Sequence, residues 1–376
     1  MRIILWLSLA LSGMSLPFTV FSQNAYTVSN VAGTSANFRT LQGAHDSVSA
    51  GSILYLLPSA TSYGVVTFTK KLTVYGTGYF LGANLAPNTQ ASAGSVILQS
   101  INFGAGSDNS FIEGVQFTDH AYGGSSLSRV SMAQVSNIVI SRCLFTPPNS
   151  QNTYYFWYNT VSNAVVRQCY FNSAGINLSG VIGMFGVDNG FSGCRFDNNI
   201  FNFLSLGLNA QSMLAGRNNG VSADATFTNN TILVTLYNSR FGNFNYTNNI
   251  FGNVAESSTY TSLNNMELGG ANLNNIFQWP SVLTAPGNNR QGVVADSLFV
   301  GTTPGYHSTD QQYMLRDTSF ANTFGVGGVA CGAFGGDNPY KLSGIPSIPY
   351  IYSLNVPNQA TAPGTISVKI KAKASN

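Results

Sequence analysis

The sequence is poor in charged residues. Asp, Glu, Lys and Arg make up 8% of the 376 residues, against about 25% in an average soluble protein. No Lys occurs between Lys71 and Lys341. Nucleic-acid binding requires clustered Lys and Arg side chains, so we expect no nucleic-acid partner. Disorder is also disfavoured, because a chain that is 44% hydrophobic and 12% aromatic can bury a substantial core.

Histidine and cysteine are scarce as well, with three and four residues. His45, His120 and His307 are far apart and have neither metal-ligand nor catalytic-triad spacing. We therefore expect no metal site and no cofactor. His45 falls within a predicted helix, so we interpret it as a packing residue.

Long apolar runs are absent after the N-terminus, so we expect no membrane span in the mature chain. The N-terminus itself has a basic Arg2, an apolar stretch over residues 3–11 and a small-residue boundary at Ser22. This order is typical of a secretory signal peptide. We predict that residues 1–22 are a signal peptide and that the protein is secreted, either extracellular or on the cell surface.

What the sequence does have is an internal repeat. A short segment that ends in Phe or Ile recurs at intervals of roughly 25 residues, a period typical of solenoid folds. Each copy follows a short run suited to a strand, such as residues 138–140 before the first copy. The copies are Ser141–Phe145, Arg167–Phe171, Ser192–Phe196, Thr228–Ile232, Thr247–Phe251, Leu273–Phe277 and Ala295–Phe299.

This repeat predicts a β-solenoid, in which each short strand pairs in parallel with its copy one turn later, about 4.8 Å away. The position two residues before the end of each copy should form one inner column. We predict that Cys143, Cys169 and Cys194 are buried there and unpaired, because stacked parallel Cβ positions disfavour a disulfide. The whole column is Cys143, Cys169, Cys194, Asn230, Asn249, Asn275 and Ser297.

The pattern of short strands, Asn-Asn and an apolar-x-Phe ending resembles the right-handed parallel β-helix of pectin-lyase-like proteins, as in secreted bacterial repeat proteins. In that family an Asn or a small residue fills the tight bend between the second and third strands. Residues 36–76 look like the N-terminal module of such proteins, and residues 310–336 look like their last coil. The resemblance implies a fold and leaves the activity open, because one fold hosts many functions.

We therefore predict an all-β protein: a right-handed parallel β-helix (β-solenoid) with an N-terminal cap helix and a C-terminal strand-rich tail. The β-helix with its cap covers residues 23–336, in roughly 10–11 coils. The cap helix covers residues 37–48, with Asn37 as its N-cap. Residues 337–376, which proline punctuates, form a tail that packs on the last coil or extends from it.

One predicted strand, Tyr154–Tyr158, is aromatic at every position. Side chains alternate between the two sides of a strand, so aligning it with Ser128–Met132 and Gly180–Met184 separates an inner column from an outer one. The inner column is Val130, Met132, Phe156, Tyr158, Ile182 and Met184.

The outer positions predict a ligand-binding surface. Arg129, Tyr155 and Trp157 should be exposed together on one face, where aromatic rings can stack on sugars. In pectin-lyase-like enzymes the corresponding face is the polysaccharide groove. A plainer interpretation is an aromatic ladder that only covers a strand. We also expect long loops to flank this face, inserted after Phe117, Phe145, Phe171 and Phe196.

Two functional interpretations stay open. The first is a secreted extracellular or cell-surface protein with a binding or structural role, whose partner is a polysaccharide or cell-surface glycan. The alternative is a polysaccharide lyase or glycoside hydrolase, with Arg129, Asp119 and His120 as catalytic candidates. Such enzymes need carboxylates on the groove face, and the three aligned strands have none. An enzyme should therefore bring at least two acids beside Arg129, from among Asp119, Asp188, Asp197 and Asp224.

Overall fold

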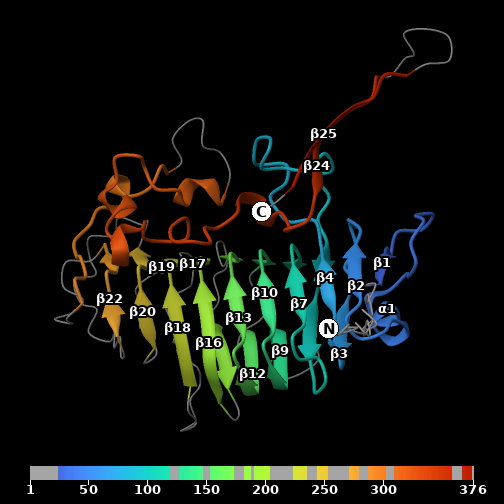
Figure 1. The fold of residues 1–376 in the computed structure, drawn as a ribbon, viewed down its shortest axis with the longest axis horizontal. Helices are drawn as coiled ribbons and strands as arrows, with labels where there is room; N and C mark the ends of the chain where they lie inside the picture. Colours follow the sequence, from blue (N-terminus) through green and yellow to red (C-terminus); the bar gives the residue numbers. More distant parts are fainter. Residues whose placement is uncertain are drawn as a thin grey trace, which may run out of the picture.

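The structure, a computed structural model, describes residues 24–118, 127–146, 153–172, 182–187, 190–203, 223–234, 244–252, 271–278, 287–301, 309–357 and 366–374. Within them, parallel strands stack into a right-handed β-helix (Figure 1). The predicted all-β class and parallel β-helix are confirmed, and a continuous stack of ten parallel strands on one face agrees with the expected number of roughly 10–11 coils. The segment 1–22, Asp119, His120 and Asp188 lie outside the described residues.

The strands form three faces, each a parallel stack. The first face consists of β3 (Val65–Phe68), β6 (Ser100–Phe103), β9 (Leu127–Ser136), β12 (Thr153–Ser162) and β15 (Ile182–Val187). The second consists of β1 (Ala25–Val28), β2 (Ile53–Leu56), β4 (Thr73–Tyr75), β7 (Phe111–Glu113), β10 (Val139–Ser141), β13 (Val165–Arg167), β16 (Phe191–Asp197), β18 (Ala223–Thr228), β20 (Asn245–Thr247) and β22 (Asn272–Leu273). The third consists of β5 (Ile97–Leu98), β8 (Gln116–Phe117), β11 (Leu144–Phe145), β14 (Tyr170–Asn172), β17 (Ile200–Phe203), β19 (Thr231–Val234), β21 (Ile250–Gly252) and β23 (Ile276–Phe277).

Stacked aromatic rings fill the interior along the third face. Phe117, Phe145, Phe171 and Phe201 lie in register on consecutive coils. Their ring centroids are 4.9, 4.6 and 4.7 Å apart, and all four rings are fully buried. Neighbouring strands have nearly the same separation, about 4.8 Å. One register therefore satisfies both the strand hydrogen bonds and the ring stacking.

The chain turns from the second face to the third through a tight corner. Its outer residue adopts the left-handed backbone conformation, with φ of 56° at Asn198, 54° at Asn229, 58° at Asn248 and 53° at Asn274. Asn tolerates this conformation better than most residues with a side chain. The abundance of Asn-Asn pairs in the repeat thus follows from the geometry of this corner.

The inner residue of the corner forms an amide ladder, which we call the Asn ladder. Each Oδ1 accepts the backbone N–H of the inner residue one coil earlier, at 2.8–2.9 Å. Each Nδ2 donates to a carbonyl of the second face, at 2.8–3.2 Å. These bonds pair backbone groups that would otherwise be buried without partners. The ladder consists of Asn199, Asn230, Asn249, Asn275 and Asn289.

The Asn ladder shows that two of the predicted copies of the repeat, residues 192–196 and 295–299, are wrong. Phe196 lies on the second face opposite Val166, whereas Phe201 is the residue that stacks on Phe171. The inner column therefore continues from Cys169 to Asn199 and ends at Asn289, so Cys194 and Ser297 are not members. Residues 192–196 imitate a copy because they too end in Phe two positions after a cysteine. All four cysteines are buried and free, as predicted for the three in the repeat.

A second core lies outside the third face. Leu144, Tyr170, Ile200, Leu233, Ile250 and Ile276 point away from the interior and pack against residues from 293 to 340, among them Leu298, Tyr313, Cys331 and Tyr340. The sequence predicts a last coil over 310–336. These residues instead carry short 3-10 helices and cover the third face. The 3-10 helices of this region are η1 (Ala295–Ser297), η2 (Gln311–Tyr313), η3 (Phe320–Asn322), η4 (Val326–Gly328) and η5 (Leu342–Gly344).

Residues 324–347 form a strap that runs back along the corners, from the last coils toward the first (Figure 1). Corner side chains bind its backbone coil by coil. Five corner side chains donate to strap carbonyls: Asn274 to Phe324 O (2.6 Å), Asn229 to Ala330 O (2.8 Å), Asn198 to Gly335 O (2.7 Å), Gln168 to Pro339 O (2.7 Å) and Arg142 to Ile345 O (2.7 Å). In a sixth bond the corner side chain accepts: Val326 N donates to Asn248 Oδ1 at 2.9 Å.

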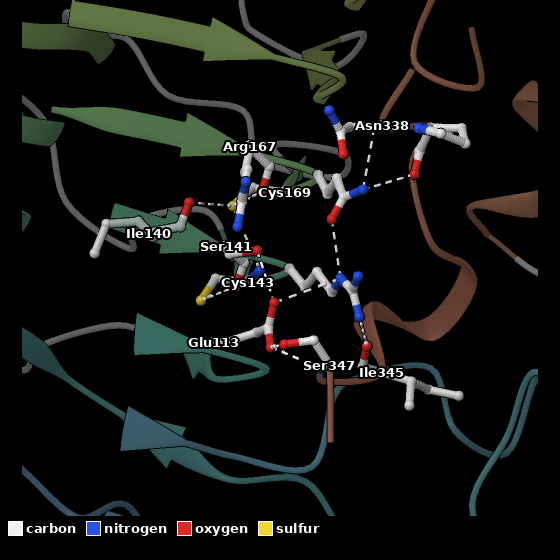
Figure 2. A network of polar contacts seen from close by, with 12 residues as sticks. Glu113, Ile140, Ser141, Cys143, Arg167, Cys169, Asn338, Ile345 and Ser347 are labelled. Carbon is white, nitrogen blue, oxygen red and sulfur yellow. Dashed lines mark hydrogen bonds and ion pairs between the residues drawn. The ribbon is translucent and has the colours of Figure 1, made fainter. Parts of the chain in front are cut away.

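The strap ends at a buried carboxylate on β7 (Figure 2). Glu113, 1% exposed, accepts hydrogen bonds from Ser347 N at 2.7 Å and from Ser141 Oγ at 2.9 Å. Its Oε1 lies 3.5 Å from Arg142 Nε. Such partners are what a buried charge requires. The first part of the predicted tail therefore packs on early coils rather than on the last one.

The N-terminal helix α1 (Leu41–Ser47) is shorter than predicted. Its N-cap is Thr40, whose Oγ1 accepts the N–H of Gly43 at 3.0 Å. Asn37, the predicted N-cap, instead accepts the N–H of Thr27. That the helix caps the solenoid stays a prediction. The helices within the described ranges are all too short to cross a bilayer.

His45 on α1 is a packing residue, as predicted. Its side chain is buried and its ring stacks on Phe68 with centroids 5.4 Å apart. Its Nε2 accepts the N–H of Thr69 at 3.1 Å.

At the other end of the chain, β24 (Tyr350–Asn355) and β25 (Lys369–Lys373) pair as an antiparallel ribbon beyond the strap.

Candidate functional site

The outer side of the first face carries a column of polar residues that ends in an indole. Thr67, Asn102, Ser131 and Trp157 lie opposite one another on successive strands. Thr67 is exposed and the other three are half-buried. Three strand spacings of about 4.8 Å give this polar column a length of about 14 Å. Of the predicted ligand-binding residues, Trp157 alone belongs to it.

Tyr155 is buried, and its predicted exposure is wrong. The side chain is 2% exposed and meets the rings of Phe145 and Phe171 edge-on, with centroids 6.0 and 5.4 Å away. Its hydroxyl donates to the carbonyl of Asn172 at 3.3 Å. Edge-on aromatic contacts and a satisfied hydroxyl favour this buried position at the end of the third face. Desolvation accordingly raises the pKa of Tyr155, with the nearby charge of Arg129 opposing the shift.

Arg129 is also buried, at 1% exposure. Its predicted place on an exposed surface with Trp157 is therefore wrong. Alternation along a strand decides which side of the sheet a residue faces, but it does not decide whether other parts of the chain cover that side. Arg129 and Tyr155 are both buried, so of the three predicted residues only Trp157 stays accessible.

The inner side of the first face agrees with the prediction for two strands. Val130, Met132, Phe156 and Tyr158 are all fully buried. In the third strand the register differs, because Phe156 lies opposite Phe185 rather than Ile182. The pairing with β12 also shifts by one residue between the pair Tyr158–Val187 and the pair Val161–Phe191. Counting back from the corner by a fixed offset cannot anticipate such an irregularity.

The acids expected of an enzyme do not gather beside Arg129 in the described chain. Asp197 lies on the second face opposite Arg167, and Asp224 on β18 accepts the N–H of Gly193 at 3.2 Å. The strands of the first face contain neither Asp nor Glu. Within the ranges that the structure covers, no three His, Cys, Asp or Glu side chains are placed to hold a metal ion. The polar column can exchange hydrogen bonds and offers one aromatic surface.

The chain is similar to solved structures of polysaccharide lyases. Pectate lyase Pel9A has 17% identity and a TM-score of 0.41, covering 79% of this chain and 88% of that one. A rhamnogalacturonan lyase has 13% identity and a TM-score of 0.35, covering 79% and 95%. An alginate lyase from Paenibacillus sp. str. FPU-7 has 14% identity and a TM-score of 0.25, covering 62% and 94%. No family model and no curated protein matches the chain. The description of the fold rests on the strand register itself.

Two arginines on the second face, Arg167 and Arg195, lie beside Asp197 and were not predicted as site residues. Arg167 lies opposite Asp197, and Arg195 Nη2 donates to Asp197 Oδ2 at 2.5 Å. Arg195 and Asp197 flank the inward Phe196, so alternation along a strand would have placed both on the outer side. The local signal is hidden because residues 192–196 resemble a copy of the repeat, which predicts a corner at this point.

Proposed function

We propose that this protein is a secreted glycan-binding protein that holds a neutral polysaccharide or cell-surface glycan along the polar column. The observation that supports this is the chemistry of the column: two hydroxyls, one amide and one indole in register. Hydroxyl and amide groups both donate and accept hydrogen bonds with sugar hydroxyls. An indole offers a flat apolar surface for a sugar ring.

The backbone favours binding by a rigid surface. The residues of the polar column sit on paired strands whose opposite sides are packed into the core, so little conformational freedom is lost when a ligand binds. The absence of Asp and Glu from these strands favours a neutral ligand. It also favours binding over cleavage, because hydrolysis in this fold depends on paired carboxylates.

The test compares wild-type protein with Trp157→Ala on an array of neutral and acidic glycans, followed by titration calorimetry. We expect about tenfold weaker binding to neutral glycans, as for loss of one aromatic contact at an interface. Tyr352→Ala on β24 is the matched control, because this tyrosine is half-buried and remote from the column. Equal affinity of Trp157→Ala and wild type would contradict the proposal.

A stability measurement checks the face assignment independently. Trp157→Ala should change the free energy of unfolding by no more than about 1 kcal/mol. Phe156→Ala should lower it by about 3–5 kcal/mol because it opens a cavity in the core. If Trp157→Ala lowered the free energy of unfolding more than Phe156→Ala, the inner and outer sides of this strand would be assigned the wrong way round. The polar column would then not be on the surface. Release of unsaturated uronides from any acidic glycan would instead favour a lyase.

A further inference from the structure

A cleft of about 410 Å³ lies between the outer side of the second face and the strap. Its floor includes Val165, Arg167 and Asp197, and its strap side includes Val329 and Asp337. This volume is within the range of small-molecule sites. The cleft is on the second face, so it is separate from the polar column on the first.

The strap side of the cleft is held in place by the corners. Asn198 Nδ2 donates to Ala333 O at 2.9 Å and to Gly335 O at 2.7 Å. Gln168 Nε2 donates to Asn338 O at 3.1 Å. These bonds flank Asp337, which lines the cleft. The cleft therefore has two fixed walls, one from the sheet and one from the strap.

Two polar atoms at the floor are buried without a hydrogen-bond partner. Asp197 is 9% exposed, and while its Oδ2 accepts from Arg195, its Oδ1 has no partner. Arg167 Nε on the neighbouring strand has none either. Buried polar groups in native proteins are nearly always paired. An acceptor and a donor left unpaired beside a cleft indicate a ligand that supplies both bonds.

The charges around the cleft are balanced. Arg167 and Arg195 face two carboxylates, Asp197 on the sheet and Asp337 on the strap. Burial raises the pKa of Asp197, and the guanidinium groups of Arg195 and Arg167 oppose that shift. An anion would meet both carboxylates, and a cation would meet both guanidinium groups, so neither class is favoured.

We infer that this cleft binds a neutral sugar, one of whose hydroxyls donates to Asp197 Oδ1 and accepts from Arg167 Nε. A hydroxyl is the simplest group that does both. The carbon–hydrogen side of the ring would contact Val165 and Val329, and a further hydroxyl would reach Asp337. This site is independent of the glycan proposed for the polar column.

The test uses the full chain with Trp157→Ala, so that binding at the polar column is weakened. The probes are cellotriose, xylotriose, mannotriose and galactotriose, with trigalacturonate as the charged comparison, titrated to millimolar concentration by calorimetry. We expect at least one neutral trisaccharide to bind. Adding Asp337→Asn, at an exposed strap position, should weaken this binding about tenfold through loss of one charged hydrogen bond.

A second variant blocks the cleft. Thr228 lines it from the outer side of β18, so Thr228→Trp should fill the space without entering the core and abolish binding. The inference is overturned if no neutral trisaccharide binds, if trigalacturonate binds more tightly, or if both Asp337→Asn and Thr228→Trp bind as tightly as their parent. Should Thr228→Trp fail to fold, Asp337→Asn decides alone.

Discussion

The corner between the second and third faces is built in two ways along the same solenoid. In the later coils the inner residue is Asn, and its Oδ1 accepts a backbone N–H at 2.8–2.9 Å. In two earlier coils it is Cys143 or Cys169, and the corresponding contact, from Cys143 N to Cys169 Sγ, measures 3.4 Å. One backbone geometry is thus completed by a full amide ladder in one half and by a weak sulfur acceptor in the other.

The outer residues of the two halves differ as well. The later coils use Asn at the left-handed position, whereas the cysteine coils use Arg142 and Gln168. Arg142 Nε donates to Gln168 Oε1 at 2.9 Å, and both side chains also bind the strap (Figure 2). The comparison teaches that the hydrogen bonds of the corner can come from inside or from outside the coil.

The largest effect is expected from breaking the Asn ladder in its middle. Asn249→Ala leaves the N–H of Asn230 and the carbonyl of Phe227 buried without partners. At about 1–3 kcal/mol for each unpaired group, the free energy of unfolding should fall by about 4 kcal/mol, measured by urea denaturation. Asn355→Ala, at an exposed position of β24, is the control. A loss no larger than the control's would show that the ladder adds little.

The equivalent truncation in the cysteine half should cost less. Cys169→Ala removes a weak acceptor and one buried sulfur atom, so we expect a loss of about 1–2 kcal/mol in the same denaturation experiment. If it equals the loss in Asn249→Ala, the two halves of the corner are energetically alike and the comparison above fails.

The variant Cys169→Asn tests whether the Asn ladder can be extended into the cysteine half of the corner. The new Oδ1 would face the N–H of Cys143, and its Nδ2 would face the carbonyl of Ile140, which now lies 3.7 Å from Cys169 Sγ. We expect a gain of about 1 kcal/mol, the net worth of a typical hydrogen bond. A loss larger than that of Cys169→Ala would mean that this half of the corner has no room for an amide.

The smallest expected effect is on the pH dependence of stability and comes from Cys194, which is not part of the inner column of the corner. Burial raises the pKa of its thiol from 9.0 to about 12. The folded protein keeps the proton where the unfolded chain has lost it, so the free energy of unfolding should fall as pH rises above about 9. Cys194→Ala should reduce that slope between about pH 8.5 and 10. An unchanged slope would contradict the raised pKa.

Thiol labelling provides a companion measurement. Because the thiolate is the reactive form, a thiol reagent at neutral pH should label none of the four buried cysteines of the native protein. All four should react after unfolding in urea. Rapid native labelling of Cys143 or Cys169 would show that the cysteine half of the corner opens readily.

The sequence by itself determined the solenoid. Its repeat, its strands and its inward Phe residues are local patterns, and parallel stacking of identical positions is the one arrangement that uses them all. The Leu-Phe and Ile-Phe pairs of the third face also carried a signal that was missed. Two adjacent apolar residues on one strand imply that both of its sides are buried, and the C-terminal residues supply the second cover.

Only the tertiary structure decided which of two similar segments makes a corner, and what covers each face. Residues 192–196 and 197–201 look alike locally, and the ladder bond from Cys169 N to Asn199 at 2.9 Å selects the second. Alternation assigned Arg129, Tyr155 and Trp157 to one side of a strand, yet two of the three are buried. Burial depends on contacts with residues distant in the sequence, such as that of Tyr155 with Phe171, and no local pattern encodes these.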